Sequence, residues 1–494
     1  MKLNMLIDGT GIHCPPKWEG LEITGISYDS RKVKQGDAFV CLKGMYTDGH
    51  KYAEDAVLRG AHVVISEENL DLQEVPILVT KDSRKILSMI SAKYYGFPSE
   101  KLTVLGITGT NGKTTISYMI KSCLEASEKA CGLTGTISYQ IGKKEYEAIN
   151  TTPESLDLQR LFSEMLDQGI KYCVMEVSSH ALQLGRVENI SFDYSVFTNF
   201  TQDHMDFHKD QEEYYQAKKK LFKLTKQAAI INVDDKSGKR LYNELLEENI
   251  KRISCSLKNK EADYYGEIME TGKKGSKLMV FHKGLKLGVL TIHLPGGFSL
   301  YNTLLTATCL SVAGIDFLAI EEGLKKLKGV PGRFELVKNP REIFVIVDFA
   351  HTPDALEKVL QTGAEIVKGR IICVFGCGGD RDTSKRPLMG EIAGNYADYC
   401  IVTSDNPRTE SQKKISKEIE VGLYKTGSKY EIIDDRRKAI AKALSIYQKG
   451  DLILITGKGH ENYQIVGRTK TYFSDQETVR ELIEKMNGGT NERD

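Results

Sequence analysis

The sequence lacks the features of a secreted or membrane-bound protein. Its ten cysteines are scattered over 494 residues with no C-x-x-C pair, and the two closest are Cys373 and Cys377. This spacing argues against a zinc site or a disulfide framework and predicts free thiols in a reducing compartment. Residues 1–8 contain no apolar core of a signal peptide, and no apolar run approaches the roughly 20 residues that cross a membrane. We therefore expect a cytoplasmic protein without membrane insertion.

An excess of charge of either sign is also missing. The 68 Lys and Arg residues nearly balance the 67 Asp and Glu residues, and no long basic block is present. Proteins that are held on nucleic acid by phosphate contacts carry a positive surface. We therefore expect no nucleic-acid partner.

The most specific motif lies in residues 105–115, Leu-Gly-Ile-Thr-Gly-Thr-Asn-Gly-Lys-Thr-Thr. An apolar stretch at 102–107 predicts a strand that enters a glycine-rich loop, and the loop ends in Lys113-Thr114 at the start of a helix. The N–H groups of such a loop surround phosphate oxygens, the lysine adds positive charge, and the threonine hydroxyl is a ligand for Mg²⁺. The usual first glycine of this motif would be residue 107, which is Ile107 here, so the loop is a variant. We predict a nucleoside triphosphate site formed by Gly109, Thr110, Asn111, Gly112, Lys113, Thr114 and Thr115.

The chain is too long for one core, and its length predicts roughly three domains on the usual scale of about 150 residues each. Apolar strands alternate with helical stretches in three blocks, which indicates an α/β fold. We expect domains at 1–100, 101–328 and 329–494, the second built on a mostly parallel, doubly wound sheet. The predicted strands are 38–42, 62–65 and 76–79, then 102–107, 172–177 and 194–198, then 343–348, 370–375, 399–403 and 452–456.

Polar residues follow several of these strands, where ligands bind in open α/β sheets. Glu176 ends the strand at 172–177 and is a candidate metal ligand, as is His204 in the loop at 198–206. Asp348 ends a strand of the third block and is a candidate for contact with adenosine or a metal. A second glycine-rich turn follows at 376–382. The run Lys218-Lys-Lys220 on a predicted helix indicates by itself only a solvated basic face.

Together these motifs resemble the Mur ligases, which are ATP-dependent amino-acid-adding enzymes of bacterial peptidoglycan synthesis. The resemblance covers essentially the whole chain and rests on residues 108–114, Glu176, His204, Asn302, 331–335 and Asp348. Further motifs resemble the branch that extends UDP-MurNAc-L-Ala-D-Glu, and they lie at 29–31, 150–152, 176–180, 379–382, 405–408 and 457–461.

The resemblance implies an N-terminal UDP-binding domain, a central P-loop ATPase-like domain and a C-terminal Rossmann-like domain that binds the amino acid. It implies that ATP, with two Mg²⁺ ions, converts the γ-carboxylate of D-Glu to an acyl phosphate, which the amino group of meso-2,6-diaminopimelate attacks. The implied catalytic residues are Lys113, Glu176, His204 and Lys218. Thr114 and Glu176 would hold one metal ion, and His204 would hold the second together with Lys218, carrying a carbamate derived from CO₂. Lys219 and Lys220 keep the solvent-facing interpretation, and we expect a monomer.

The resemblance also assigns residues to each ligand. In addition to the loop, ATP would contact Asn302, Arg333 and Asp348. The UDP-sugar dipeptide would contact Tyr28, Ser30, Met45, Tyr46, Thr47, Asn150, Thr151, Thr152, Ser178 and Arg186. Diaminopimelate would contact Arg381, Asp405, Asn406, Pro407, Arg408, Gly457 and Glu461. One departure is Leu184, which stands where some relatives have a glutamine; Gln183 is adjacent but out of register.

Three alternatives stay open at the level of sequence. L-Lysine could replace diaminopimelate, but Arg408 offers a planar fork for the distal carboxylate that lysine lacks. A ligase similar to folylpolyglutamate synthase is a second alternative, although that enzyme has no counterpart of the first hundred residues. A P-loop switch is the third, and the sequence lacks the Asn-Lys-x-Asp motif that reads guanine.

Overall fold

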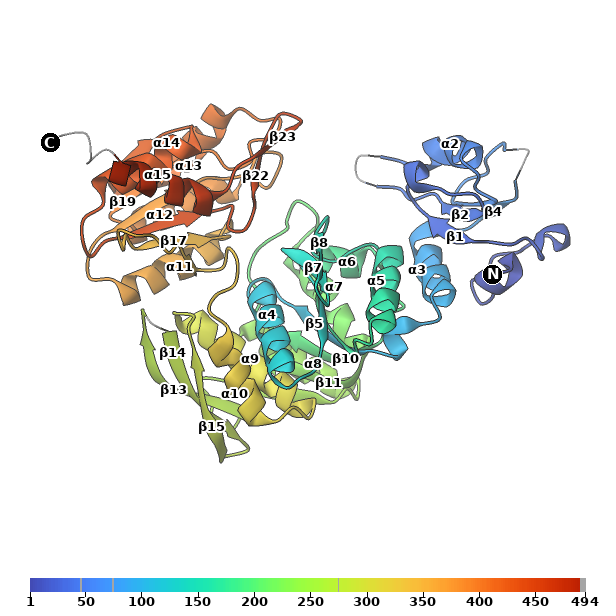
Figure 1. Ribbon diagram of the computed structural model, residues 1–494, viewed down its shortest axis with the longest axis horizontal. Helices are drawn as coiled ribbons and strands as arrows, with labels where there is room; N and C mark the ends of the chain where they lie inside the picture. Colours follow the sequence, from blue (N-terminus) through green and yellow to red (C-terminus); the bar gives the residue numbers. More distant parts are fainter. Residues whose placement is uncertain (45–46, 73–74, 274, 489–494) are drawn as a thin grey trace.

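The computed structural model describes residues 1–44, 47–72, 75–273 and 275–488 and consists of three α/β parts in chain order (Figure 1). The three-part α/β architecture predicted from the sequence is confirmed, while the residue numbers of the domain boundaries stay predictions. All ten cysteines lie in the described residues and are free. No helix within the described ranges is long and apolar enough to cross a membrane.

The first part is a parallel four-stranded sheet in the order β1-β2-β3-β4. Its strands are β1 (Gly25–Ser27), β2 (Asp37–Val40), β3 (Val63–Ser66) and β4 (Ile77–Val79). Its α-helices are α1 (Leu3–Ile7), α2 (Ala53–Leu58) and α3 (Ser83–Tyr94). Strands β2 and β3 are buried along their whole length, as expected of parallel strands that are covered on both faces. Helix α3 leads from this part toward the central one (Figure 1).

The central part contains an eleven-stranded sheet in the order β15-β14-β13-β12-β11-β10-β5-β9-β6-β7-β8. Its strands are β5 (Thr103–Thr108), β6 (Cys131–Thr134), β7 (Ser138–Ile141), β8 (Lys144–Glu147), β9 (Tyr172–Glu176), β10 (Phe192–Phe197), β11 (Thr225–Asn232), β12 (Arg252–Ser256), β13 (Tyr264–Gly272), β14 (Gly275–His282) and β15 (Leu285–Ile292). Its helices are α4 (Lys113–Ala126), α5 (Ser155–Asp167), α6 (Ser179–Gln183), α7 (Gln211–Lys223), α8 (Lys236–Glu247), α9 (Gly297–Val312) and α10 (Phe317–Lys326).

The strands from β13 to β6 in this order run parallel, whereas β14, β15, β7 and β8 add antiparallel edges. These edges were not predicted. Consecutive strand residues point to opposite faces of the sheet, and helices cover both faces. Leu105 packs in a core with Met119 of α4, whereas Val104 packs in a second core with Phe162 of α5.

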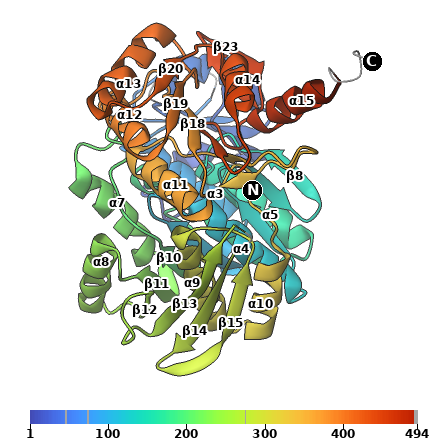
Figure 2. The ribbon, with the colours of Figure 1, turned by 90° about the vertical axis from the view of Figure 1, so that its left-hand side faces the viewer.

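The third part has a six-stranded sheet in the order β16-β17-β21-β18-β19-β20, parallel except for the short β16. Its strands are β16 (Glu335–Leu336), β17 (Val345–Asp348), β18 (Ile371–Phe375), β19 (Tyr399–Val402), β20 (Tyr430–Ile432) and β21 (Leu452–Thr456), with a separate hairpin of β22 (Tyr463–Val466) and β23 (Thr469–Tyr472). Its helices are α11 (Pro353–Ile366), α12 (Lys385–Tyr396), α13 (Gln412–Thr426), α14 (Arg436–Ile446) and α15 (Asp475–Gly488). Helix α11 lies on the side of this part that faces the central part (Figures 1 and 2).

Candidate functional site

One cavity of about 1380 Å³ is lined by residues of all three parts. The first part contributes Lys43, Gly44 and Arg84, and the central part contributes the glycine-rich loop. The third part contributes the loops after β17, β18, β19 and β21. Most of the residues predicted to bind ligands lie along this cavity. They are Thr110 to Thr115, Asn150 to Thr152, Glu176, Ser178, Arg186, His204, Lys218, Asn302, Arg333, Asp348, Arg381, Asp405, Asn406, Arg408, Gly457 and Glu461.

The glycine-rich loop joins β5 to α4 and requires glycine at two positions. Gly109 has φ +140° and Gly112 has φ +91°, both in the region that favours glycine. A Cβ on Gly109 would lie 1.9 Å from Thr198 Oγ1, and one on Gly112 would lie 2.6 Å from Asn302 Oδ1. The loop after β10 and helix α9 therefore pack against the glycine-rich loop and hold its backbone N–H groups at the N-terminus of α4.

Two lysines donate to the same carbonyl oxygen of this loop. Lys113 Nζ lies 2.9 Å from Gly109 O, and Lys218 Nζ, from α7, also lies 2.9 Å from that oxygen. Burial lowers the pKa of Lys113. Burial, together with the charge of Lys113, lowers the pKa of Lys218 well below its usual range. A lowered pKa increases the share of the neutral amine, which is the nucleophilic form of lysine.

Glu176 stands at the end of β9 and faces the start of α4. The Thr114 hydroxyl donates to Glu176 Oε2 at 2.9 Å, and Arg333 Nη2 of the third part donates to that hydroxyl at 3.0 Å. The Thr136 N–H and hydroxyl each donate to the Glu176 carboxylate at 2.9 Å. This group offers hydroxyl and carboxylate oxygens, which are the ligands that Mg²⁺ prefers.

His204 lies in the loop after β10, in a left-handed conformation with φ +57°. Its Nε2 is 3.3 Å from Asp203 Oδ2, and its ring packs edge-on against His180, with centroids 4.7 Å apart. Burial lowers the pKa of His204 to about 3. The ring is therefore neutral at pH 7, the form in which histidine binds a metal ion.

Asp348 at the end of β17 lies close to Arg333. It accepts hydrogen bonds from Phe334 N and Ala350 N, both at 2.6 Å, and burial raises its pKa. The Arg333 guanidinium lies 4.5 Å from the centroid of the Phe349 ring. These residues and Asn302 form the part of the cavity nearest the loop.

The residues predicted to bind the UDP-sugar peptide divide into two groups. Thr152 donates to Glu176 O at 2.8 Å, and Arg186 Nη1 donates to Thr152 O at 3.1 Å, so both lie beside the candidate metal ligands. Tyr28, Ser30 and Thr47 belong to the first part and do not line the cavity. Two residues predicted for other ligands, Gly109 for ATP and Pro407 for diaminopimelate, do not line it either. Met45 and Tyr46 lie outside the described residues.

The residues predicted to bind the amino acid come together from three loops. Arg408 has φ +51°, and its Nη1 donates to Gly379 O at 2.8 Å. Asn406 Nδ2 donates to Glu461 Oε2 at 2.9 Å. A Cβ on Gly457 would lie 2.4 Å from Asp405 Oδ2, so a larger residue there would displace that carboxylate.

Several contacts at the cavity escaped prediction. Asp354, in the first turn of α11, accepts hydrogen bonds from Asn111 Nδ2 at 2.8 Å and Thr201 Oγ1 at 3.1 Å of the central part. Glu154 lies between Arg84 of the first part, at 2.9 Å, and Arg186, at 3.2 Å. No local signal marks such residues, because their partners are distant in the sequence.

The expectation that Lys219 faces solvent is wrong. Its side chain is 13 % exposed, and its Nζ lies 3.0 Å from Glu244 and 2.8 Å from Glu248. Helix α8 packs beside α7 and supplies Glu244, and Glu248 directly follows the last residue of α8. Lys220 is exposed, as expected.

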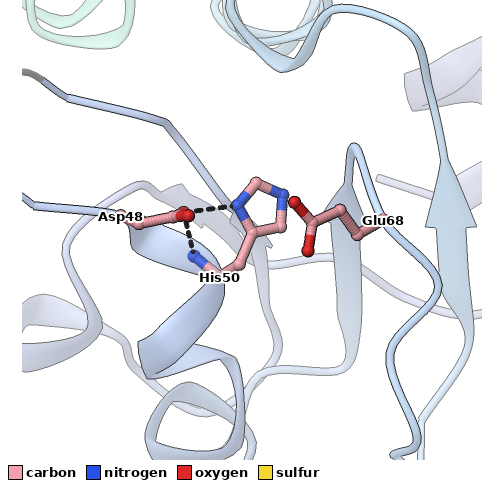
Figure 3. A group of neighbouring side chains, drawn as sticks. All are labelled: Asp48, His50 and Glu68. Atoms are coloured by element: carbon pink, nitrogen blue, oxygen red, sulfur yellow. Dashed lines mark hydrogen bonds and ion pairs between the residues drawn. The ribbon is translucent and has the colours of Figure 1, made fainter.

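Asp48, His50 and Glu68 form a second group of acidic and histidine side chains in the first part (Figure 3). His50 Nε2 accepts from Glu67 N at 3.0 Å, so Nδ1 carries the proton that it shares with Asp48 at 2.6 Å. Glu68 pairs with Lys43 at 2.7 Å. Because both ring nitrogens of His50 already have partners, we interpret this group as a hydrogen-bonded contact that joins the segment at 48–50 to the segment at 67–68.

Comparison with known proteins gives a consistent family. Residues 22–100 match the Mur ligase family catalytic domain, residues 107–310 the Mur ligase middle domain, and residues 332–459 the Mur ligase glutamate ligase domain. The chain is 45 % identical over 486 residues, 98 % of its length, to all of a UDP-N-acetylmuramoyl-L-alanyl-D-glutamate–2,6-diaminopimelate ligase of Clostridioides difficile strain 630. It is 46 % identical over 470 residues, 94 % of its length, to 96 % of the ligase 1 of that name from Clostridium acetobutylicum.

Solved structures agree with this relationship. A structure of a UDP-N-acetylmuramoyl-L-alanyl-D-glutamate–2,6-diaminopimelate ligase matches with a TM-score of 0.69 and 32 % identity, over 99 % of this chain and 100 % of that one. MurF ligase of Thermotoga maritima in complex with ADP matches with a TM-score of 0.64 and 19 % identity, over 95 % of this chain and 99 % of that one, and shows the shared fold.

Proposed function

Because the chain belongs to the Mur ligase family, we propose that it joins meso-2,6-diaminopimelate to the γ-carboxylate of D-Glu in UDP-MurNAc-L-Ala-D-Glu. ATP drives the reaction through an acyl phosphate. The observation that carries this proposal is the single cavity in which the glycine-rich loop, Glu176 and Lys218 meet Arg408 and Glu461 of the third part. Relatives named for diaminopimelate favour that amino acid over lysine.

The nucleotide end of the cavity suits phosphoryl transfer, in which the protein positions groups and balances developing charge. The loop N–H groups and Lys113 would hold the β- and γ-phosphates. Arg333 lies 3.0 Å from Thr114 Oγ1 and brings a second cation to the same point. Asn302 and Asp348 would contact the adenosine.

The donor residues fit two Mg²⁺ ions. Thr114 and Glu176 provide hard oxygen ligands for one, and His204 with a carbamate on Lys218 would provide ligands for the other. When bound, Mg²⁺ would neutralise negative charge on the phosphates of ATP and on the γ-carboxylate of D-Glu. The buried Lys218 amine would attack CO₂ and release a proton to give the carbamate.

The amino-acid end of the cavity suits a ligand whose distal carbon carries both a carboxylate and an ammonium group. Arg408 would bind the distal carboxylate, Asp405 or Glu461 the distal ammonium, and Arg381 the carboxylate next to the reacting amine. Contacts between the central and third parts would exclude water from the acyl phosphate.

Phosphate release from ATP tests the reaction class. We expect release only when both UDP-MurNAc-L-Ala-D-Glu and meso-diaminopimelate are present, with one amide formed for each phosphate. Release with ATP alone would indicate a conformational ATPase or a switch.

Arg408→Ala tests the choice of amino acid. The wild-type protein should prefer meso-diaminopimelate to L-lysine by roughly 10⁴-fold in kcat/KM, because lysine leaves Arg408 without a carboxylate. We expect the substitution to remove most of this preference. Arg468→Ala, at the exposed turn between β22 and β23, is the matched control. Equal wild-type use of both amino acids, or no loss in the Arg408 variant, would contradict the assignment.

A further inference from the structure

Lys458 is a fully buried cation beside the amino-acid end of the cavity. Its side chain is 0 % exposed and follows β21, in the loop that also contains Gly457 and Glu461. A buried ammonium is stable only when it is paired and hydrogen-bonded. Lys458 Nζ lies 3.1 Å from Glu461 Oε2, 3.3 Å from Asn406 Oδ1 and 5.4 Å from the centroid of the Tyr463 ring.

These contacts fix the orientation of the Asn406 amide. Its Oδ1 accepts from Lys458 Nζ and from Ile465 N at 3.0 Å, so its Nδ2 must point the other way. Nδ2 donates to Glu461 Oε2 at 2.9 Å. The side chains of Lys458, Asn406 and Glu461 thus form a closed network in which each contacts the other two.

The network leaves the two oxygens of Glu461 in different situations. Oε2 accepts from both Lys458 and Asn406, whereas Oε1 has a contact of 3.3 Å with the Tyr463 hydroxyl. Glu461 lines the cavity and Lys458 does not. Oε1 has one partner and Oε2 has two, so Oε1 has more capacity to accept from a ligand ammonium. Lys458 can act on the ligand only through Glu461 and Asn406, which lines the cavity as well.

We propose that Lys458 is a positioning residue that holds Glu461 so that its Oε1 reads the distal ammonium of the incoming diamino acid. This inference rests on the proposed function and adds the residue that sets selection for a second amine. Without Lys458, Glu461 would lose its charged partner and turn away from this geometry. The site would then discriminate poorly between acids with and without that amine.

The experiment compares meso-diaminopimelate with L-2-aminopimelate, which has both carboxylates but no second amine. We expect wild-type protein to prefer diaminopimelate by at least about 100-fold in kcat/KM, because a buried group without its partner penalises the analogue. Lys458→Met should lower this preference by about tenfold or more through KM for diaminopimelate. The KM values for ATP and UDP-MurNAc-L-Ala-D-Glu, and kcat, should change little.

Lys470→Met is the matched control. The Nζ of Lys470 lies 4.2 Å from the centroid of the same Tyr463 ring, but its side chain is 52 % exposed and pairs with Glu147. We expect this variant to keep the wild-type preference. Lys458→Gln, which keeps a hydrogen-bond donor without the charge, decides the question if thermal unfolding shows that Lys458→Met does not fold.

The outcomes separate this inference from the proposed function. If wild-type protein ligates diaminopimelate selectively but the Lys458 variants keep the same preference, the role of Lys458 is refuted and the proposed function stands. A parallel rise of KM for all three substrates would indicate a merely structural role and also refute it. If wild-type protein does not ligate diaminopimelate, the proposed function itself fails.

Discussion

At the scale of single residues, charge at the glycine-rich loop decides what the site can do. Lys113 and Lys218 donate to one carbonyl oxygen, that of Gly109, so the charge of Lys113 disfavours a second ammonium at Lys218. Conversion of Lys218 to an anionic carbamate would relieve this repulsion and leave Lys113 as the cation for the phosphates. The two lysines therefore have opposite proposed roles although they share a partner.

Lys113→Ala should abolish ligation while the fold is retained. The loss of one preorganised charge at the phosphates costs roughly 10²–10³-fold in turnover. The measurement is kcat at saturating ATP, with circular dichroism as the check on folding. A variant that stays within a few-fold of wild-type turnover would show that Lys113 does not position the phosphates.

Lys218→Ala should be nearly inactive and partly rescued by added short carboxylates, which would replace the carbamate oxygens. Lys220→Ala, on the exposed side of the same helix, is the matched control and should keep wild-type activity. Mass spectrometry of the native protein should find the mass of CO₂ on Lys218. Unmodified Lys218 together with activity that is insensitive to CO₂ removal would refute the proposal.

At the scale of elements, the connection from β5 to α4 shows why this loop depends on tertiary structure. Gly112 starts α4 in a left-handed conformation directly against Asn302 of α9. The shape of this local connection therefore depends on α9, whose Asn302 lies about 190 residues later in the sequence.

Gly112→Ala should weaken ATP binding more than it weakens the fold. Left-handed backbone costs an alanine about 1 kcal/mol, and its Cβ would also lie 2.6 Å from Asn302 Oδ1. We expect KM for ATP to rise about tenfold or more, because small displacements of positioning groups are costly.

Gly450→Ala is the control for backbone strain alone. Gly450 has φ +104°, and no atom lies within 4 Å of a Cβ there. It should lose a similar free energy of unfolding without any change in KM for ATP. Equal effects of the two substitutions on KM would show that the contact with Asn302 is unimportant.

At the scale of the whole molecule, hydrogen bonds between the parts assemble the cavity. Arg333 donates a hydrogen bond to Thr114, and Asp354 accepts one from Asn111, so the third part contacts the nucleotide loop at two points. Asp354 also accepts from Thr201, in the loop after β10. Glu154 joins Arg84 of the first part to Arg186 of the central part. The site therefore exists only when the parts are held together.

Asp354→Ala should loosen the third part from the central part. It removes an acceptor that two groups of the central part share, and we expect KM for ATP to rise by a few-fold to about tenfold. Small-angle X-ray scattering should report a larger radius of gyration. Glu357→Ala is the control, since Glu357 lies on the same helix but bonds only to Gln361 and Tyr396 of its own part among the described residues.

If Asp354→Ala leaves both KM for ATP and the scattering profile unchanged, this carboxylate does not hold the parts together. A change in scattering of the Glu357 variant as well would indicate a general loss of stability in α11.

The sequence by itself determined the α/β class, the nucleotide loop and most of the parallel strands. Strands β9, β10, β18 and β21 lie within about two residues of their predicted positions, because local apolar runs and glycine signals carry that information. The antiparallel edges of the central sheet escaped prediction, because pairing of β13 with β14 depends on register between segments rather than on either segment alone.

Only the tertiary structure decided which side chains act together. The burial of Lys218, the pairing of Lys219 with α8, and the network of Lys458, Asn406 and Glu461 all depend on partners from other elements. A lysine has the same local pattern whether it is solvated or buried. Its charge state and its partner are set by packing and desolvation, which arise only when distant segments meet.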